Sequence, residues 1–190
     1  VGAGIAAVKL GPGIAAQLRK IGQATGDTAA MDKAGAALGE LIPRSKLRAP
    51  GRTFLEQRTT GLGTEPVRTY MPDKLDDMSV DQIADLTVKS MVKQGAFERS
   101  RIVVQSPSGI GWVNPGPVMI DELLSDGDTA WVAAQFGSMP SMASLHKTPQ
   151  AVERVMALVR RIADERDVKF PNGGGPPIYL SATSLGARNL

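Results

Sequence analysis

The residues best suited to chemistry lie at positions 182–186 of the 190-residue sequence, where Ala-Thr-Ser-Leu-Gly follows the β-prone run Ile178–Thr183. This segment approximates the pattern G-x-S-x-G, with alanine in the first glycine position. In that pattern a tight strand-to-helix turn lifts the serine hydroxyl above a sheet edge, and small neighbours let strand and helix approach. The pattern predicts Ser184 as a nucleophile for acyl transfer, with the amide of Leu185 as one donor to the oxyanion. An ordinary turn with a helix-capping serine is the alternative.

A second candidate segment, Gln-Ser-Pro-Ser-Gly-Ile-Gly-Trp at 105–112, follows the β-branched run Ile102–Val104. In hydrolases built on a serine turn, the second oxyanion donor comes from a loop after an earlier strand. We therefore predict the amide of Gly109 or of Ile110 as that donor. The alternative is a purely structural role, in which a glycine-rich turn packs Trp112 against the core. A phosphate loop is disfavoured, because a third glycine at the required spacing and a Gly-Lys-Ser/Thr sequence are both missing.

The segment 137–146 follows a third predicted strand and mixes polar with apolar residues, so Ser138 and Met139 are predicted pocket residues together with Trp112. His146 is the one histidine of the sequence. It precedes Ser184, whereas the order expected for this kind of hydrolase is serine, then acid, then histidine. We interpret it as a surface or pocket-rim residue. The acid and histidine are then expected beyond Leu190, and without a base Ser184 is a poor nucleophile.

The elements that must position these residues alternate between strand and helix from Pro66 onward. Strands are predicted at 67–71, 102–104, 129–136 and 178–183, and helices at 80–91, 117–124 and 148–163. The alternation predicts an α/β fold with a largely parallel sheet, helices on both faces and reactive groups at the carboxyl ends of the strands. Residues 1–60 are predicted to be a linker or juxtamembrane arm with a weak helix at 28–41, interrupted by Pro43, Pro50 and Gly51. Residues 61–190 form the predicted catalytic part.

Composition excludes several classes of function. The absence of cysteine excludes disulfides and thiolate metal sites, and a single histidine excludes a zinc site built on several histidines, so no metal or cofactor is predicted. The net charge of +3 is too small for the basic patch of a nucleic-acid binder. The apolar start, Val1–Val8, is too short to span a bilayer before Lys9 and is read as a flexible flank or as the tail of a membrane helix. A start at Val1 and an end shortly after Ser184 predict a fragment of a longer chain.

Several motifs together resemble a bacterial α/β-hydrolase family with an N-terminal multi-span membrane region and a C-terminal catalytic domain. The resemblance covers roughly residues 40–190, and its most specific part is Gly-Ile-Gly-Trp-Val-Asn-Pro at 109–115. It implies the first half of an α/β-hydrolase fold, with Ser184 in the nucleophile position, and an esterase or lipase acting on a small-molecule or lipid ester. It also implies that the full-length protein is held in the bacterial cell membrane by a region that precedes this chain. Ala182 and Thr183 depart from the family's usual Gly-Glu pair. A non-catalytic binding or membrane-assembly module of the same fold is the alternative. The other motifs that carry the resemblance are Arg101–Gly109, Gly127–Thr129, Gln135-Phe136, Pro140-Ser141, Tyr179-Leu180 and Ser184–Ala187.

Overall fold

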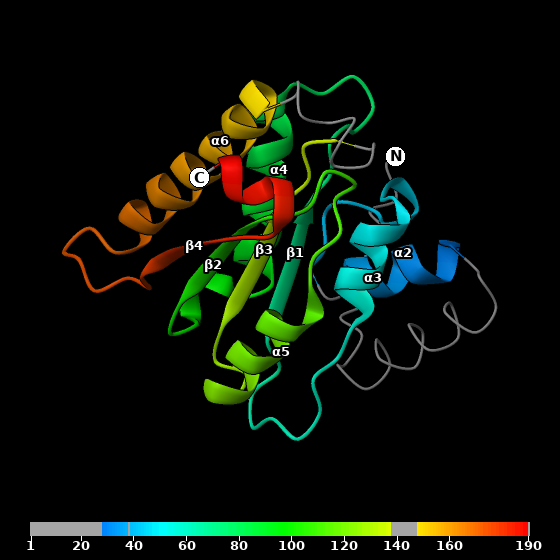
Figure 1. Cartoon of the computed structure of the whole chain (residues 1–190). Helices are drawn as coiled ribbons and strands as arrows, with labels where there is room; N and C mark the ends of the chain where they lie inside the picture. The colour runs from blue at the N-terminus through cyan, green and yellow to red at the C-terminus, as the bar shows by residue number, and fades with distance from the viewer. Residues whose placement is uncertain (1–27, 38, 138–147, 190) are drawn as a thin grey trace, which may run out of the picture.

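A computed structural model of the chain describes residues 28–37, 39–137 and 148–189, and these residues are built around one four-stranded sheet (Figure 1). The strands are β1 (Val67–Met71), β2 (Ile102–Ser106), β3 (Ala130–Ala134) and β4 (Ile178–Ala182). Their spatial order is β1-β3-β2-β4, and every neighbouring pair is parallel. The predicted parallel α/β sheet is therefore confirmed.

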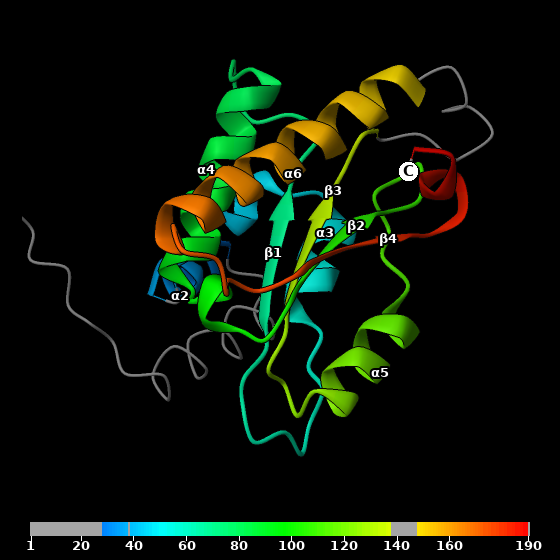
Figure 2. The same ribbon diagram turned by 90° about the vertical axis from the view of Figure 1, so that its left-hand side faces the viewer.

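The strand order dictates which helices share a face. The connections β1 to β2, through α4 (Val80–Lys93), and β3 to β4, through α6 (Thr148–Lys169), run the same way along the sheet. The connection β2 to β3, through α5 (Pro115–Leu124), runs back. Because such crossovers are right-handed, α4 and α6 lie on one face, where they pack together, and α5 lies on the other (Figure 2).

Local chemistry explains where the structure moves the predicted boundaries. The helix α5 begins at Pro115 rather than at residue 117, because the side chain of Asn114 accepts a hydrogen bond from the Gly116 amide and caps the helix. Pro115 fits the first helical position, where no amide hydrogen is needed. The strand β3 ends at Ala134 rather than at residue 136, so Gln135 and Phe136 lie beyond the sheet. The helix α2 (Thr28–Ala37) ends four residues before the predicted limit at residue 41.

The segment after α2 packs against the sheet. It contains the 3-10 turn η1 (Arg44–Lys46) and α3 (Ala49–Glu56), and Ile42, Leu47, Phe54 and Leu55 belong to the same buried cluster as the strands. The prediction that Pro50 and Gly51 interrupt regular structure was wrong. Pro50 lies in the first turn of α3, where its missing amide costs nothing. The role predicted for residues 1–60 as an arm stays a prediction, but residues 42–55 are part of the packed body.

A buried ion pair joins three of these elements. Arg68 of β1 donates from Nε and Nη2 to the two carboxylate oxygens of Glu122 in α5, at 2.7 and 2.6 Å. Its Nη1 donates to the backbone oxygens of Phe54 and Gln57 at the end of α3, at 3.1 and 2.7 Å. The Thr59 hydroxyl donates to the same carboxylate. Both charged side chains are almost fully buried, so the pair fixes α3 and α5 against one face of the sheet.

The capping box that the sequence predicts at the start of α4 is present, because Ser79 Oγ accepts from the Gln82 amide and Gln82 Oε1 accepts from the Ser79 amide. Replacing Ser79 with alanine is expected to lower the free energy of unfolding by about 1 kcal/mol, since one helix amide loses its partner. Urea unfolding measures this loss. Lys89→Ala, an exposed position in the middle of the same helix, is the control and should change stability by less than about 0.5 kcal/mol. Equal losses in the two variants would contradict a capping role.

Candidate active site

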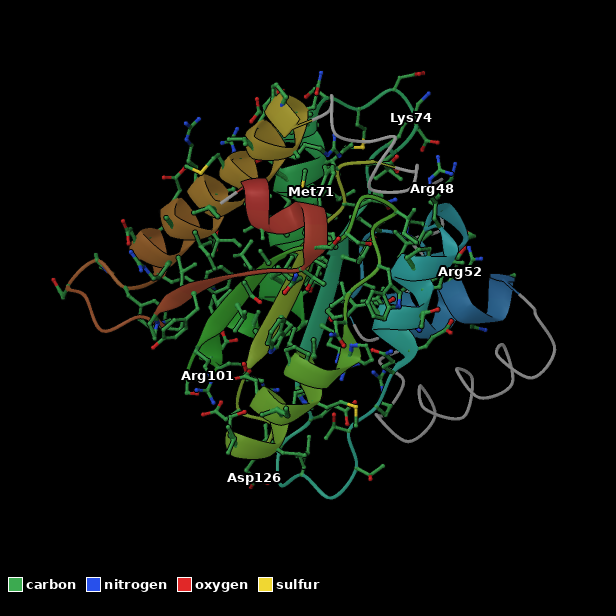
Figure 3. All side chains as sticks on the ribbon, viewed as in Figure 1. Arg48, Arg52, Met71, Lys74, Arg101 and Asp126 are labelled. Atoms are coloured by element: carbon green, nitrogen blue, oxygen red, sulfur yellow. The ribbon has the colours of Figure 1, made fainter. Side chains whose placement is uncertain are left out.

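The carboxyl ends of all four strands lie along one edge of the sheet, since the strands are parallel. Figure 3 shows Met71 and Lys74 toward this end, and Arg101 and Asp126 toward the opposite one. Four segments emerge at the carboxyl edge: residues 72–79 after β1, 107–113 after β2, 135–137 after β3, and the 3-10 turn η4 (Ser184–Asn189) after β4. Strands β2 and β4 are neighbours, so the two segments that the sequence selects for chemistry start side by side.

Ser184 has an unusual backbone conformation, with φ of +57°. Among the described residues, the other non-glycine residues with positive φ are Asp76 and Asp126. Aspartate tolerates the left-handed region because its short side chain bonds locally, whereas serine enters it at a cost of about 1–2 kcal/mol. Such strain tends to persist at functional sites. Ser184 is also exposed, so its hydroxyl is accessible to a reactant. A 3-10 turn, not the expected α-helix, follows it.

The turn at Ser184 is held against the end of β2. The Thr183 amide donates to the Ser106 carbonyl at 3.0 Å, and Gln105 Nε2 donates to Thr183 Oγ1 at 3.1 Å. The Gly186 amide closes the turn on the Thr183 carbonyl at 3.0 Å. A Cβ atom at Gly186 would lie 2.2 Å from the Ser106 carbonyl oxygen and 2.5 Å from that of Pro107. The small residue that the sequence pattern demands at 186 is therefore required by the close approach of two backbones.

Residues 107–112 form a tight turn whose tip is Gly109-Ile110. The Gly111 amide donates to the Ser108 carbonyl at 2.8 Å, and the Ser108 amide donates to the Trp112 carbonyl at 3.1 Å. The Trp112 amide donates to Ser108 Oγ at 3.2 Å. The amides at the base of the turn therefore donate their hydrogen bonds to other groups of the same turn. The Ile110 amide has no hydrogen-bond partner in the part of the chain that the structure describes.

A model of the alpha/beta-hydrolase family matches residues 67–190, which include the four strands, the turn at 107–112 and Ser184. The chain belongs to the alpha/beta-hydrolase family. No curated protein and no solved structure matches the chain. Membership accounts for the parallel sheet and its helices, while the chemical roles of individual residues stay predictions.

In this alpha/beta-hydrolase the residues predicted for catalysis lie at the carboxyl edge of the sheet, in two groups. Ser184 and Leu185 are consecutive residues of η4, and Gly109 and Ile110 form the tip of the turn after the neighbouring strand. Trp112, predicted to line a pocket, is the last residue of that turn and is 41% exposed. Ser138, Met139 and His146 lie outside the described residues. The choice between Gly109 and Ile110 as oxyanion donor stays open.

Three polar side chains of this alpha/beta-hydrolase lie beneath the edge, and sequence reasoning assigned none of them a supporting role: Tyr70, Gln105 and Gln135. All three are almost fully buried, and each donates a hydrogen bond to the 106–112 segment or to Thr183. In the sequence each of them is a polar residue near the end of an apolar strand. Such a pattern fits a side chain exposed to solvent and a buried hydrogen-bond donor equally well. Only the tertiary contacts distinguish the two.

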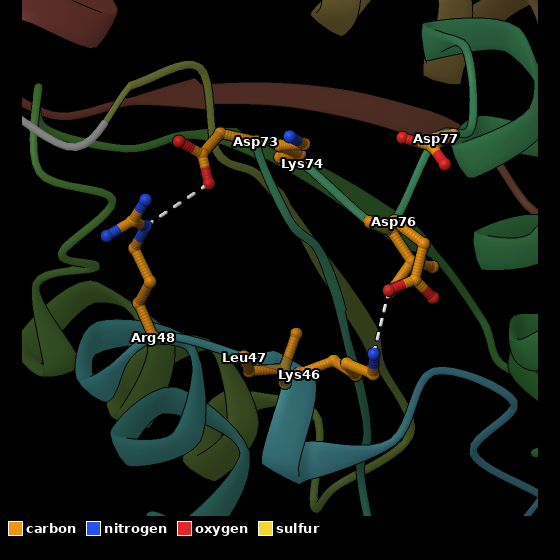
Figure 4. Close-up of a pocket in the computed structure, with 8 residues that line it drawn as sticks. Lys46, Leu47, Arg48, Asp73, Lys74, Asp76 and Asp77 are labelled. Atoms are coloured by element: carbon orange, nitrogen blue, oxygen red, sulfur yellow. Dashed lines mark hydrogen bonds and ion pairs between the residues drawn. The ribbon is translucent and has the colours of Figure 1, made fainter.

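A charged pocket of about 510 Å³ lies beside the end of β1, between the η1–α3 segment and the loop after β1 (Figure 4). Lys46 pairs with Asp76 at 2.7 Å and Arg48 with Asp73 at 3.4 Å, and the Asp76 carboxylate raises the pKa of Lys46. Strands β1 and β4 are the two outer strands of the described sheet, so three strand spacings, about 14 Å, separate their ends. This pocket is therefore not placed to hold a substrate against Ser184.

Among the described residues, no group of three or more histidine, cysteine, aspartate or glutamate side chains is arranged to hold a metal ion. No helix within the described ranges combines the length and the hydropathy needed to cross a membrane.

Proposed function

We propose that this alpha/beta-hydrolase is a serine hydrolase of the esterase or lipase type, with Ser184 as its nucleophile and a small-molecule or lipid ester as its substrate. The observation that carries the proposal is the left-handed backbone of Ser184 at the carboxyl edge of the sheet. The contact of its turn with Ser106 and Pro107, where the 107–112 turn begins, adds support, because an oxyanion donor is expected from that loop in this fold.

In the proposed reaction Ser184 Oγ attacks the ester carbonyl carbon and passes its proton to a histidine. The carbonyl oxygen becomes an oxyanion, which accepts hydrogen bonds from the Leu185 amide and from the amide of Gly109 or Ile110. Each such donor contributes about 3 kcal/mol in the transition state. The tetrahedral intermediate breaks its bond to the alkoxy oxygen, which takes the proton from the histidine and leaves as the alcohol. Water then hydrolyses the acyl-serine by the same steps.

The histidine and its acid are proposed to follow Ser184 in the full-length protein, because the chain order in this fold is serine, acid, histidine. The hydroxyl of a serine without such a base is almost wholly protonated at neutral pH. A full-length sequence without any histidine after Ser184 would contradict the hydrolase and favour a non-catalytic binding module.

Labelling with a fluorophosphonate tests the nucleophile directly. In the full-length protein the probe is expected to attach to Ser184, and Ser184→Ala is expected to abolish labelling, because the attacking oxygen is lost. Peptide mass mapping identifies the modified residue. Ser181→Ala is the matched control, since Ser181 lies three residues earlier in β4, and it should label at the wild-type rate. Labelling that survives Ser184→Ala would place the nucleophile elsewhere, and an unreactive full-length wild type would argue against an enzyme.

A further inference from the structure

Two buried side chains lie directly beneath the Gly109-Ile110 turn, and neither contacts Ser184. The Tyr70 hydroxyl, on β1, donates to the Gly111 carbonyl at 2.8 Å. Gln135 Nε2, just after β3, donates to the Ile110 carbonyl at 3.4 Å and to the Gly137 carbonyl at 2.6 Å. Tyr70 is 1% exposed and Gln135 is 0% exposed. The turn therefore accepts hydrogen bonds from one residue of β1 and from one residue just after β3, and neither belongs to β2, the strand that precedes the turn.

These contacts fix successive peptide planes of the turn. A peptide unit is rigid, so holding its carbonyl also orients the amide on its other side. The plane between Ile110 and Gly111 is held by Gln135 at the carbonyl and by the Ser108 carbonyl at the amide. The next plane, between Gly111 and Trp112, is held by Tyr70 and by Ser108 Oγ. The base of the turn is fixed at four points, which sets the direction of the Gly109-Ile110 tip.

The backbone of Gln135 is itself held on both sides. Its backbone N–H donates to the Met71 carbonyl at 2.9 Å, and its backbone carbonyl accepts from Arg154 Nε of α6 at 2.9 Å. Arg154 also donates to the Pro72 carbonyl at 2.5 Å. Gly111 packs closely against both side chains, because a Cβ there would lie 2.4 Å from Tyr70 Oη and 2.8 Å from Gln135 Cδ.

The glutamine at position 135 carries a cost in stability. Its Oε1 is buried and has no hydrogen-bond partner among the described residues. A buried acceptor left unpaired costs about 1–3 kcal/mol, and the side chain retains in exchange its two hydrogen bonds to the Ile110 and Gly137 carbonyls. Departures of this kind are expected at functional sites.

We propose that Tyr70 and Gln135 are positioning residues that hold the base of the 108–112 turn, so that an amide at its Gly109-Ile110 tip faces the oxyanion formed at Ser184. This inference rests on the proposed hydrolase function. Neither side chain touches the reacting atoms. Burial raises the pKa of Tyr70 well above its usual range, so its hydroxyl stays protonated and remains a donor at every pH at which the enzyme works.

The test uses the full-length protein with Tyr70→Phe, Gln135→Met and the double variant, assayed with a p-nitrophenyl ester. Each single variant is expected to lower kcat by about 10- to 100-fold, because the oxyanion donor is misplaced, with KM unchanged within about twofold. The double variant should lose less than the product of the two, since both side chains hold one turn. The pH dependence of kcat/KM should keep its wild-type shape, because neither variant touches the base.

Two matched controls separate positioning from general damage. Tyr179→Phe removes the other tyrosine hydroxyl of the chain, from a half-exposed side chain on β4. Thr87→Val removes a buried hydroxyl that bonds only within α4. Both should keep the wild-type kcat.

Amide hydrogen exchange supplies a readout that does not depend on turnover. Peptides covering 107–113 should exchange about tenfold faster in Tyr70→Phe and Gln135→Met than in the wild type, while those covering β2 should not change. If both variants showed wild-type exchange and kcat while Ser184 was still labelled by the fluorophosphonate, the positioning role would be overturned and the proposed hydrolase function would stand. A raised KM with unchanged kcat would overturn it equally, by assigning these residues to binding. An unreactive wild type would remove the proposed function and this inference together.

Discussion

Gly186→Ala is expected to destabilise the protein by about 3 kcal/mol and to abolish the fluorophosphonate labelling of Ser184 that the proposed function predicts. The added methyl group would lie 2.2 Å from the Ser106 carbonyl oxygen, and 2.5 Å from that of Pro107. Both contacts are with backbone, so no side chain can rotate away to make room. The turn must then separate from β2, which breaks the hydrogen bond between the Thr183 amide and Ser106. Ser184 would lose the backbone conformation that presents its hydroxyl.

Urea unfolding and the rate of labelling measure the two effects separately. The matched control is Gly116→Ala in the first turn of α5, where the nearest atom to the new Cβ would be 3.5 Å away, an ordinary contact. That variant should be as stable as the wild type within about 0.5 kcal/mol and should label normally. If Gly186→Ala behaved like Gly116→Ala, the close approach of the Ser184 turn to β2 would be refuted.

Breaking the buried pair of Arg68 and Glu122 is expected to have the largest effect on stability. Glu122→Leu or Arg68→Met alone should lower the free energy of unfolding by about 3–5 kcal/mol, because each leaves one uncompensated charge inside the protein. The double variant should be more stable than the sum of the two losses predicts, since no buried charge remains. It does not recover completely, because the Phe54 and Gln57 carbonyls still lack the donor that Arg68 provides.

A double-mutant cycle in urea measures the coupling between the two residues. The exposed pair of Lys46 and Asp76 is the matched control, and Lys46→Ala and Asp76→Asn should change stability by no more than about 1 kcal/mol with little coupling, since asparagine tolerates the positive φ at position 76. Additive losses for Arg68→Met and Glu122→Leu would show that the two charges do not depend on each other.

The alternation of strand and helix was readable from the sequence because each element keeps its own period. The β-branched run at 102–104 and the apolar stripe of α4 each indicate one kind of element, and the pairing of Ser79 with Gln82 marks a helix start before any tertiary contact forms. Parallel pairing followed, since strands joined through helices enter the sheet in the same direction. The two segments proposed for chemistry were found for the same reason, because turns at the ends of strands carry local glycine and serine signals.

The tertiary structure decided what depends on residues far apart in the chain. Tyr70 reaches Gly111 across 41 positions and Arg68 reaches Glu122 across 54, and no local pattern records such distances. Pro50 and Gly51 signal a break in the local sequence, yet α3 includes both, because Pro50 sits in its first turn and the side-chain-free Gly51 lies against the Tyr70 ring. The sequence by itself determined the four strands, the three helices between them and their order, since these follow from short-range periodicity. The partners of buried polar groups were fixed only when the sheet brought the ends of its strands together.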